Sequence, residues 1–353
     1  MGTLGTAVAS TTATTSRWLR AAIRRGRGPT TARTRPPSPD RATAVPAPPI
    51  LPDGAVVVDD APPASGARAP ELSPDARGAV IIPAHNESAV IGRTLDALAP
   101  LAALDGVEVI VACNGCSDAT ADIARGYPGV RVAETAQASK PAALNLGDRA
   151  ATAWPRLYLD ADIEVPPAAI LAVFDTLRRG GVLAARPRYV YDVAGAAAPV
   201  RSYYRARSRI PAPPTRLWGA GGYAASEEGH RRIGDFPPVT ADDSWFDEQF
   251  TADEKRVVVT PPMRVRTARD TAGLLAVLAR QRRGYREIGV ASATASRGSA
   301  LLATIRGPRT AWDAAWYVAL TVVSRRRARR AARLRAPGWE RDGSTRSGVE
   351  AAR

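Results

Sequence analysis

The chain has 353 residues, 45% of them hydrophobic, and a formal net charge of +15 at pH 7. This apolar content is enough to bury a substantial core, which excludes a wholly disordered protein. A positive charge of this size suits an anionic membrane surface, a nucleic acid or a phosphorylated substrate. Much of the excess lies in two arginine-rich segments, residues 17–27 and 325–335, and the chain between them is closer to balance.

Cys113 and Cys116 are the only cysteines, so the sequence holds no disulfide framework and favours a reducing cytoplasm. Their C-x-x-C spacing lacks the further ligands of a zinc site, because the chain has only two histidines and no second cysteine pair.

No stretch of the sequence reaches the roughly 18 to 20 apolar residues that span a bilayer. The closest, Ala311 to Val323, contains two tryptophans and runs into the C-terminal arginines. Two interpretations stay open for it. It is either a helix in the interface of an anionic membrane, which makes the protein peripheral on the inner face of the cell membrane, or an amphipathic helix docked on a globular domain.

Residues 1–77 are rich in Pro, Thr, Ala, Ser and Arg, and we predict that they are disordered except for a short helix over Trp18 to Ile23. From Gly78 onward, strands alternate with helices. The predicted strands are 79–83, 107–112, 130–133, 156–159 and 256–259, and the predicted helices are 88–98, 117–125 and 141–150. This alternation predicts an α/β fold with a mostly parallel central sheet and helices on both faces. A helical region follows over residues 271–336, and residues 337–353 are predicted to be a disordered tail.

Polar motifs follow three of these predicted strands directly: Pro83 to Glu87, Cys113 to Asp118, and Asp160 to Asp162. Ligands of parallel α/β sheets bind outside the carboxyl ends of the strands. Three polar motifs that converge on one edge therefore predict a ligand site there.

Asp160 and Asp162 are separated by one residue after an apolar strand. In an extended segment residues i and i+2 point the same way, so both carboxylates can face one hard cation. Mg²⁺ or Mn²⁺ held by one or two carboxylates and by phosphate oxygens is a common arrangement for nucleotide substrates, where the metal acts as a Lewis acid. An isolated acid pair is more often a solvated turn, but the preceding strand favours the metal site.

Lys140 and Lys255 are the only lysines of an arginine-dominated chain. Lys140 precedes a predicted helix, where a point charge can meet phosphate. Asn114, Asp118 and Asn145 supply further polar groups at the same edge. Taken singly, turn formation and helix capping explain Asn114 and Asp118 better.

Asp242 and Asp243 lie just before Trp245 and Phe246. A carboxylate beside another acid and aromatic residues can have a raised proton affinity, which suits a general base that accepts a proton from a hydroxyl. A helix N-terminus that carries acids is at least as common, so both interpretations stay open.

Together these segments resemble the family 2 inverting glycosyltransferases, whose nucleotide-binding fold is called GT-A. The motifs that carry the resemblance are Val80 to Glu87, Asn114 to Thr120, Lys140 to Gly147, Asp160 to Asp162, and Asp242 with Asp243. Their order and spacing match from about residue 78 to residue 265, which is far more specific than any single motif.

The resemblance implies a GT-A domain over residues 78–270, hexosyltransferase-like, that moves a sugar from a nucleotide-diphosphate sugar to a hydroxyl acceptor with inversion. The implied nucleotide-sugar contacts are Pro83, His85, Asn86, Glu87, Asn114, Asp118, Lys140, Asn145 and Asp160. Asp162 with Asp160 is implied to hold the metal, and Asp243 beside Asp242 to deprotonate the acceptor. The implied acceptor region comprises Gly221, Gly222, Tyr223, Gln281 and Arg283.

The sequence departs from the family pattern in three places. Gln281 to Tyr285 only approximates the Gln-x-x-Arg-Trp motif of processive members, which favours transfer of a single sugar. Cys113 and Asn114 stand where the family often has two acids, and Ser139 stands where a glycine usually precedes the lysine.

Two other functions stay open: a nucleotide-sugar-binding protein without catalysis, and a nucleotidyltransferase. Pro83 to Glu87 is not the glycine-rich basic loop that a nucleotidyltransferase normally has after its first strand. A nucleic-acid partner is not expected, because it would explain the arginine-rich segments but not the three motifs on one edge.

Overall fold

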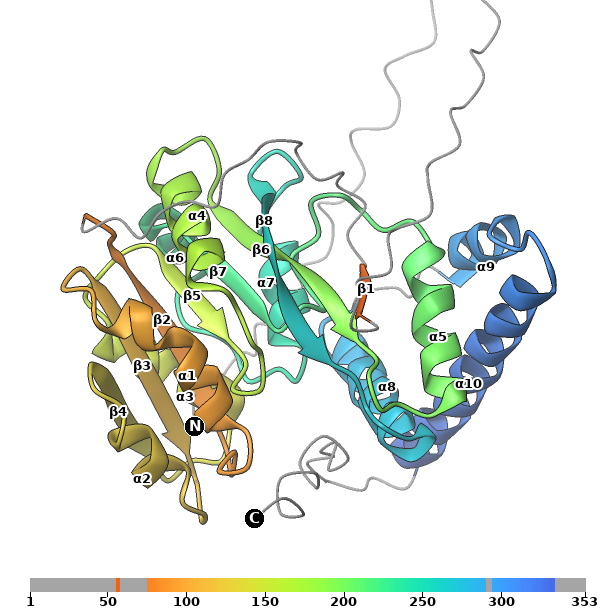
Figure 1. Ribbon diagram of the computed structural model, residues 1–353, viewed down its shortest axis with the longest axis horizontal. Coiled ribbons are helices and arrows are strands. Elements are labelled where there is room, and N and C mark those ends of the chain that lie inside the picture. Colours follow the sequence, from red (N-terminus) through yellow and green to blue (C-terminus); the bar gives the residue numbers. More distant parts are fainter. Residues whose placement is uncertain (1–54, 58–74, 290–293, 334–353) are drawn as a thin grey trace, which may run out of the picture. The chain divides into compact units, whose positions relative to one another are not determined.

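The computed structural model describes residues 55–57, 75–289 and 294–333, and Figure 1 shows their helices and strands. The chain divides into one unit of residues 1–46 and another of residues 47–353, and the described elements all belong to the second. The helix predicted over Trp18 to Ile23 and the predicted tail 337–353 lie outside the described residues.

The described strands form one mixed sheet with the order β1-β6-β7-β5-β2-β3-β4, and β8 pairs with β6. Their bounds are β1 Ala55–Val57, β2 Gly78–Ala84, β3 Val107–Asn114, β4 Val130–Thr135, β5 Arg156–Leu159, β6 Ala184–Asp192, β7 Gly222–Ala225 and β8 Lys255–Arg266. β2 pairs in parallel with β3 and with β5, and β3 pairs in parallel with β4. β7 is antiparallel to both neighbours and joins this parallel half to β6.

The helices of the unit cover both faces of the sheet (Figure 1). Their bounds are α1 Ile91–Ala102, α2 Thr120–Arg125, α3 Lys140–Ala150, α4 Pro167–Arg178, α5 Ala198–Arg209, α6 Glu227–Ile233, α7 Asp242–Glu248, α8 Thr271–Glu287, α9 Thr294–Ala303 and α10 Pro308–Arg333. The predicted fold class, α/β with helices on both faces, is confirmed.

Burial on both faces explains the apolar run that forms β2, in which all seven residues are buried. Because side chains alternate along a strand, Val80 and Ile82 pack in one core with α1 and α4, whereas Ile81 packs in a second core with Leu144 of α3. A Cβ atom on Gly147 of α3 would stand 2.3 Å from Cγ2 of Ile81. Glycine at this position lets α3 lie directly on β2.

Several boundaries differ from the sequence-based expectations. α2 begins at Thr120 instead of Ser117, and β8 runs from Lys255 to Arg266 instead of over residues 256–259. α1 begins at Ile91 instead of Ser88, because the N–H groups of Val90 and Ile91 both donate to the carbonyl of Glu87 and form a turn there. Residues 55–57 form β1 inside the segment predicted to be disordered, because this strand pairs with β6 from far along the chain.

The C-terminal helices pack on the domain. α10 lies against α5 and α8 in Figure 1. Asp313 of α10 forms ion pairs with Arg205 (2.7 Å) and Arg209 (2.9 Å) of α5. Arg282 of α8 donates to Ser324 of α10 (3.0 Å). α10 is therefore docked on the domain, as one of the two interpretations expected. None of the described helices is both long and apolar enough to cross a bilayer.

Candidate active site

A cavity of about 530 Å³ opens at the carboxyl ends of β2, β3 and β5. Most of the predicted site residues line it: Pro83, His85, Glu87, Asn114, Lys140, Asp160, Asp162, Gly221, Asp242, Asp243, Gln281 and Arg283. Asn86, Asp118, Asn145, Gly222 and Tyr223 do not line it. The structure thus brings together motifs that are far apart in the sequence, and α8 contributes to the wall although it follows the predicted domain boundary.

Lys140, at the start of α3, contacts Asp160 after β5 and Asp242 of α7. Its Nζ atom lies 2.7 Å from Oδ1 of Asp160 and 3.0 Å from Oδ1 of Asp242. The lysine is the first residue of α3, where Ser139 caps the helix by accepting from the N–H of Ala142. Burial alone would lower the pKa of Lys140, but Asp160 and Asp242 outweigh it and raise the pKa, so the lysine is a fixed positive charge.

The two adjacent aspartates of α7 have different environments. Asp242 is 3% exposed, and its Oδ2 accepts from the hydroxyl of Tyr223 at 2.7 Å while its Oδ1 meets Lys140. Asp243 is more exposed and accepts from the backbone N–H of Gly219 (2.7 Å) and of Ser244 (2.6 Å). Burial, and then the charge of Asp242, raise the pKa of Asp243 above the usual aspartate value. Asp242 is therefore held by protein groups, and Asp243 is the one suited to accept a proton.

The donor set at Asp160 and Asp162 fits a hard divalent cation. The described residues contain no group of three His, Cys, Asp or Glu side chains that could hold a metal by themselves. Two carboxylates completed by substrate phosphate oxygens are a sufficient set for Mg²⁺ or Mn²⁺. A Cβ atom at Gly221 would stand 3.2 Å from Oδ2 of Asp160, so the glycine leaves room beside this oxygen.

The loops after β2 and β3 hold each other in place. Nδ1 of His85 is hydrogen-bonded to the carbonyl of Asn114. Asn86 adopts a left-handed backbone conformation (φ 53°), and its Oδ1 accepts from the N–H of Ser117 at 2.7 Å. Asn114 is 2% exposed, and its amide nitrogen has no hydrogen-bond partner among the described residues. A buried donor without an acceptor is what a bound ligand or an ordered water would satisfy.

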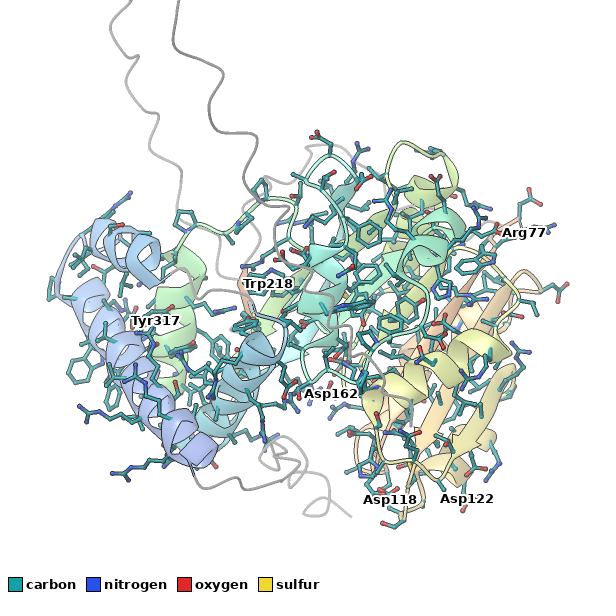
Figure 2. All side chains as sticks on the ribbon, turned by 180° about the vertical axis from the view of Figure 1, so that it is seen from behind. Arg77, Asp118, Asp122, Asp162, Trp218 and Tyr317 are labelled. Carbon is teal, nitrogen blue, oxygen red and sulfur yellow. The ribbon has the colours of Figure 1, made fainter. Side chains whose placement is uncertain are left out.

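Asp118 and Asn145, both expected at the nucleotide, support neighbouring backbone instead. Asp118 accepts from the N–H groups of Ser88 (3.1 Å) and Thr120 (3.0 Å), so it joins the start of α2 to the loop before α1. Burial would raise the pKa of Asp118, but these hydrogen bonds outweigh it and lower the pKa. Asn145 exchanges two hydrogen bonds with the backbone of Phe236. Figure 2 shows Asp118 and Asp122 at the lower end of the domain, below Asp162, and of these three residues only Asp162 lines the cavity.

Two residues expected near the acceptor belong to β7. Gly222 and Tyr223 are buried in this strand, where Tyr223 pairs with Tyr158 of β5 and holds Asp242. Tyr223 thus supports α7 through Asp242, whereas Gly221, just before the strand, reaches the cavity.

The sequence did not predict a contact between α8 and the segment before α7, both of which line the cavity. Glu287 at the end of α8 accepts from the N–H (2.7 Å) and the hydroxyl (3.0 Å) of Thr240. A Cβ atom on Gly284 of α8 would stand 2.5 Å from Cβ of Ala241. Close contact with α8 therefore fixes the segment just before Asp242. Nothing local in the sequence indicates this pairing, because the partners lie in different elements.

The cysteine pair belongs to the loop after β3. Cys116 donates from Sγ to the carbonyl of Ala84 and accepts from the N–H of Asn86, both at 3.4 Å. Burial raises the pKa of Cys113 to about 12, which keeps its thiol protonated at neutral pH. Both cysteines have a structural role here.

The parallel half of the sheet thus carries at its carboxyl edge a cavity lined by acidic residues, by Lys140 and by the pair Asp242 and Asp243. Residues 79–221 match the family model described as Glycosyl transferase family 2. This part of the chain is therefore similar to the family 2 glycosyltransferases, the family that the motifs predicted.

Individual proteins are similar over parts of the chain. Validoxylamine A glucosyltransferase of Streptomyces hygroscopicus subsp. jinggangensis is 32% identical over 188 residues, which cover 49% of this chain and 38% of that protein. The chain thus spans well under half of the length of this relative.

Two solved structures match parts of the chain. The mannosyltransferase PcManGT from Pyrobaculum calidifontis, in complex with GDP-Man and Mn²⁺, is 20% identical with a TM-score of 0.46, covering 76% of this chain and 78% of that chain. Glucosyl-3-phosphoglycerate synthase from Mycobacterium tuberculosis, in complex with Mn²⁺, UDP and glucosyl-3-phosphoglycerate, is 22% identical with a TM-score of 0.43, covering 62% of this chain and 82% of that chain.

Proposed function

We propose that the protein transfers a single sugar from a nucleoside-diphosphate sugar to a hydroxyl acceptor, with inversion at the anomeric carbon and with Mg²⁺ or Mn²⁺ as cofactor. The observation that carries the proposal is the convergence of Lys140, Asp160, Asp162 and Asp243 on one cavity at the carboxyl edge of the sheet. The family of residues 79–221 supports glycosyl transfer as the reaction class.

The donor is proposed to bind on the side of the cavity formed by the loops after β2, β3 and β5. His85 and Glu87 line this side, and Asn114 offers a buried amide donor there. Lys140 supplies a fixed positive charge at the start of α3, where helix N–H groups also favour phosphate.

The charge of the cavity supports a divalent cation in the proposed site. Six acidic residues line the cavity against four basic ones, and the acidic residues are Glu87, Asp160, Asp162, Asp242, Asp243 and Glu287. A diphosphate brought into this region would meet net repulsion unless a cation lay between the two. Asp160 and Asp162 would hold the metal, which supplies Lewis-acid stabilisation of the departing diphosphate.

Asp243 is proposed to act as the general base. Its carboxylate would accept the proton of the acceptor hydroxyl while that oxygen attacks the anomeric carbon, and the bond from this carbon to the diphosphate breaks on the opposite face. The backbone N–H groups of Gly219 and Ser244 orient the carboxylate, and Lys140 with Tyr223 fixes Asp242 behind it. Attack opposite the leaving group gives inversion.

The acceptor is proposed to enter between Gly221 and α8, whose residues Gln281 and Arg283 line the same cavity. Gly221 has a positive φ of 70°, and a side chain there would collide with Ile163. Gly221 is only partly buried and lines the cavity, so its backbone is available to a sugar or another hydroxyl compound.

A melting-temperature screen against UDP-, GDP- and dTDP-sugars, with and without Mn²⁺, tests the donor and the metal together. A ligand at about 100 times its dissociation constant adds roughly 2.7 kcal/mol of stability, or roughly 5 to 10 °C in melting temperature. We expect a shift with one nucleotide that requires Mn²⁺, followed by sugar transfer to a hydroxyl acceptor in a product assay.

The Asp162→Ala variant, with Asp122→Ala as its matched control, separates specific from general effects. Asp122 is an exposed aspartate of α2 outside the cavity. A Mn²⁺-dependent shift that Asp162→Ala keeps in full contradicts the metal assignment. A shift with no transfer in any product assay favours a nucleotide-sugar-binding protein, and loss of all nucleotide shifts contradicts the proposed function.

A further inference from the structure

Exposed hydrophobic side chains are concentrated near the end of the described chain. Apart from Val259, every exposed large hydrophobic residue of the described part lies between residues 302 and 323. Most of them belong to α10, where Trp312 is 60% exposed and Val318 is 48% exposed. These side chains take no part in the cavity.

The outward face of α10 is apolar over several turns. From residue 311 to residue 323 the exposed positions are Ala311, Trp312, Ala315, Val318, Ala319, Val322 and Val323, and none is polar or charged. The only charged residue of this stretch, Asp313, is 0% exposed and pairs with Arg205 and Arg209. This is the reverse of an ordinary surface helix, whose polar residues face solvent.

Packing fixes which face of α10 points outward. Asp313 binds α5, and Ser324 accepts from Arg282 of α8, so the helix is held at both ends of the apolar stretch. Arg286 of α8 also donates to the carbonyl of Ala328, one turn further along. The apolar face therefore cannot turn inward without breaking these contacts.

The helix continues directly into positive charge. Arg326, Arg327, Arg329 and Arg330 are exposed on the turns that follow Val323. Trp312 packs edge-on against Trp316 at a ring distance of 6.0 Å, and tryptophan is a side chain that favours the boundary between lipid and water. An apolar helical face with aromatic residues, followed by clustered arginines, is the pattern of a helix that lies in an anionic membrane interface.

We propose that the outward face of α10, residues 311–330, binds the surface of an anionic lipid bilayer. This goes beyond the proposed sugar transfer and does not depend on it. Charge complementarity favours an anionic bilayer over other partners of this face. A second copy of the chain would bring the same arginines against these arginines. A nucleic acid would pair with the arginines but leave the apolar face in water. Binding is peripheral, because the inward face of α10 stays packed on α5 and α8.

The membrane face lies one helix away from the cavity. Arg282 of α8 contacts α10, while its neighbours Gln281 and Arg283 line the cavity. Attachment through α10 therefore holds the transferase domain at the bilayer surface without covering residues of the site.

Sedimentation of the full chain with vesicles tests the proposal. Phosphatidylcholine vesicles with and without phosphatidylglycerol are the probes. We expect retention only with phosphatidylglycerol. The Arg326→Gln/Arg327→Gln variant should bind roughly 30-fold more weakly, since each basic residue near an anionic surface contributes about a fivefold factor. Trp312→Ser/Val318→Ser should bind at least roughly tenfold more weakly, because both exposed apolar side chains leave the interface.

Each variant has a matched control elsewhere on the domain. Arg179→Gln/Arg231→Gln removes the same charge from exposed positions of the α4 C-terminus and α6. Val259→Ser removes an apolar side chain that is 43% exposed on β8. The controls should retain wild-type binding, and unchanged melting temperatures in all variants would separate lost binding from lost folding.

Three outcomes overturn the proposal. The first is equal retention by vesicles with and without phosphatidylglycerol, or no retention. The second is wild-type binding by both α10 variants, which assigns attachment to other basic segments. The third is a dimer in solution that Trp312→Ser/Val318→Ser converts to a monomer without change in vesicle binding, which makes the face an interface between copies.

Discussion

Replacement of Asp243 by asparagine tests the proposed chemistry most directly. Asparagine keeps the size of the side chain but cannot accept the acceptor's proton. General-base catalysis contributes roughly 10²- to 10⁴-fold, so we expect kcat to fall by a factor in that range. Donor binding should persist, because Lys140, Asp160 and Asp162 are unchanged.

The structure also sets the expected cost in stability. Both carboxylate oxygens of Asp243 accept backbone N–H groups, from Gly219 at 2.7 Å and from Ser244 at 2.6 Å. The asparagine NH₂ group can replace neither acceptor, so one backbone donor loses its partner at a cost of about 1 to 3 kcal/mol. Removal of a negative charge beside Asp242 offsets part of this cost. The variant should therefore fold, with a lower melting temperature.

The pH dependence gives a second readout. Burial and Asp242 raise the pKa of Asp243, so its base form is gained, and activity rises, as the pH increases through a value above the usual aspartate range. The sign for stability is opposite: a raised folded-state pKa contributes stability below the unfolded-state pKa, and this contribution is lost as the pH rises through the folded-state pKa. The variant should lose both dependences.

Steady-state kinetics test whether Asp243 is the general base. They compare wild type with Asp243→Asn and Asp122→Asn, and the shift in melting temperature reports donor binding in each. Asp122→Asn makes the same chemical change at an exposed position of α2 and should match wild type. If Asp243→Asn keeps kcat within a factor of about ten, below the general-base range, another group takes the proton and the reasoning is refuted.

Three further changes have expected outcomes. Asp162→Ala should abolish Mn²⁺-dependent transfer while circular dichroism stays unchanged; turnover at the wild-type rate would remove the metal site. Gly147→Ala should destabilise the domain by about 1 to 3 kcal/mol, since its Cβ would meet Ile81, and urea unfolding measures this. Asp118→Ala should cost about 1 kcal/mol at neutral pH without a change in kcat, because the N–H groups of Ser88 and Thr120 lose their acceptor. Burial would raise the pKa of Asp118, but its hydrogen bonds outweigh burial and lower the pKa. The stability lost in Asp118→Ala should therefore shrink as the pH falls through this lowered pKa.

Much of the nucleotide side was predictable from local sequence. The apolar runs that became β2, β3 and β5 are buried on both faces, which gives continuous hydrophobic segments, and a polar motif follows each one. Because parallel strands end at a common edge, order and spacing were enough to predict that Asn114, Lys140 and Asp160 would lie at the same edge, and all three line the cavity. The fold class followed from the same pattern.

The roles of other predicted site residues depended on which neighbouring groups their side chains contact. Asp118 and Asn145 carry polar groups suited to a ligand, but their hydrogen bonds go to backbone of other segments. Tyr223 was expected at the acceptor and instead holds Asp242 from inside β7. A sequence motif records the type of a residue and not the direction of its side chain.

The sequence by itself determined the chemistry available at the sheet edge and the apolar and basic composition of residues 311–330, since both depend on residue type and spacing. The tertiary structure decided the division of roles between Asp242 and Asp243, the contact of Glu287 with Thr240, and which face of α10 remains exposed. These depend on contacts between segments far apart in the chain, which are selected by packing of the whole domain and leave no local pattern in the sequence.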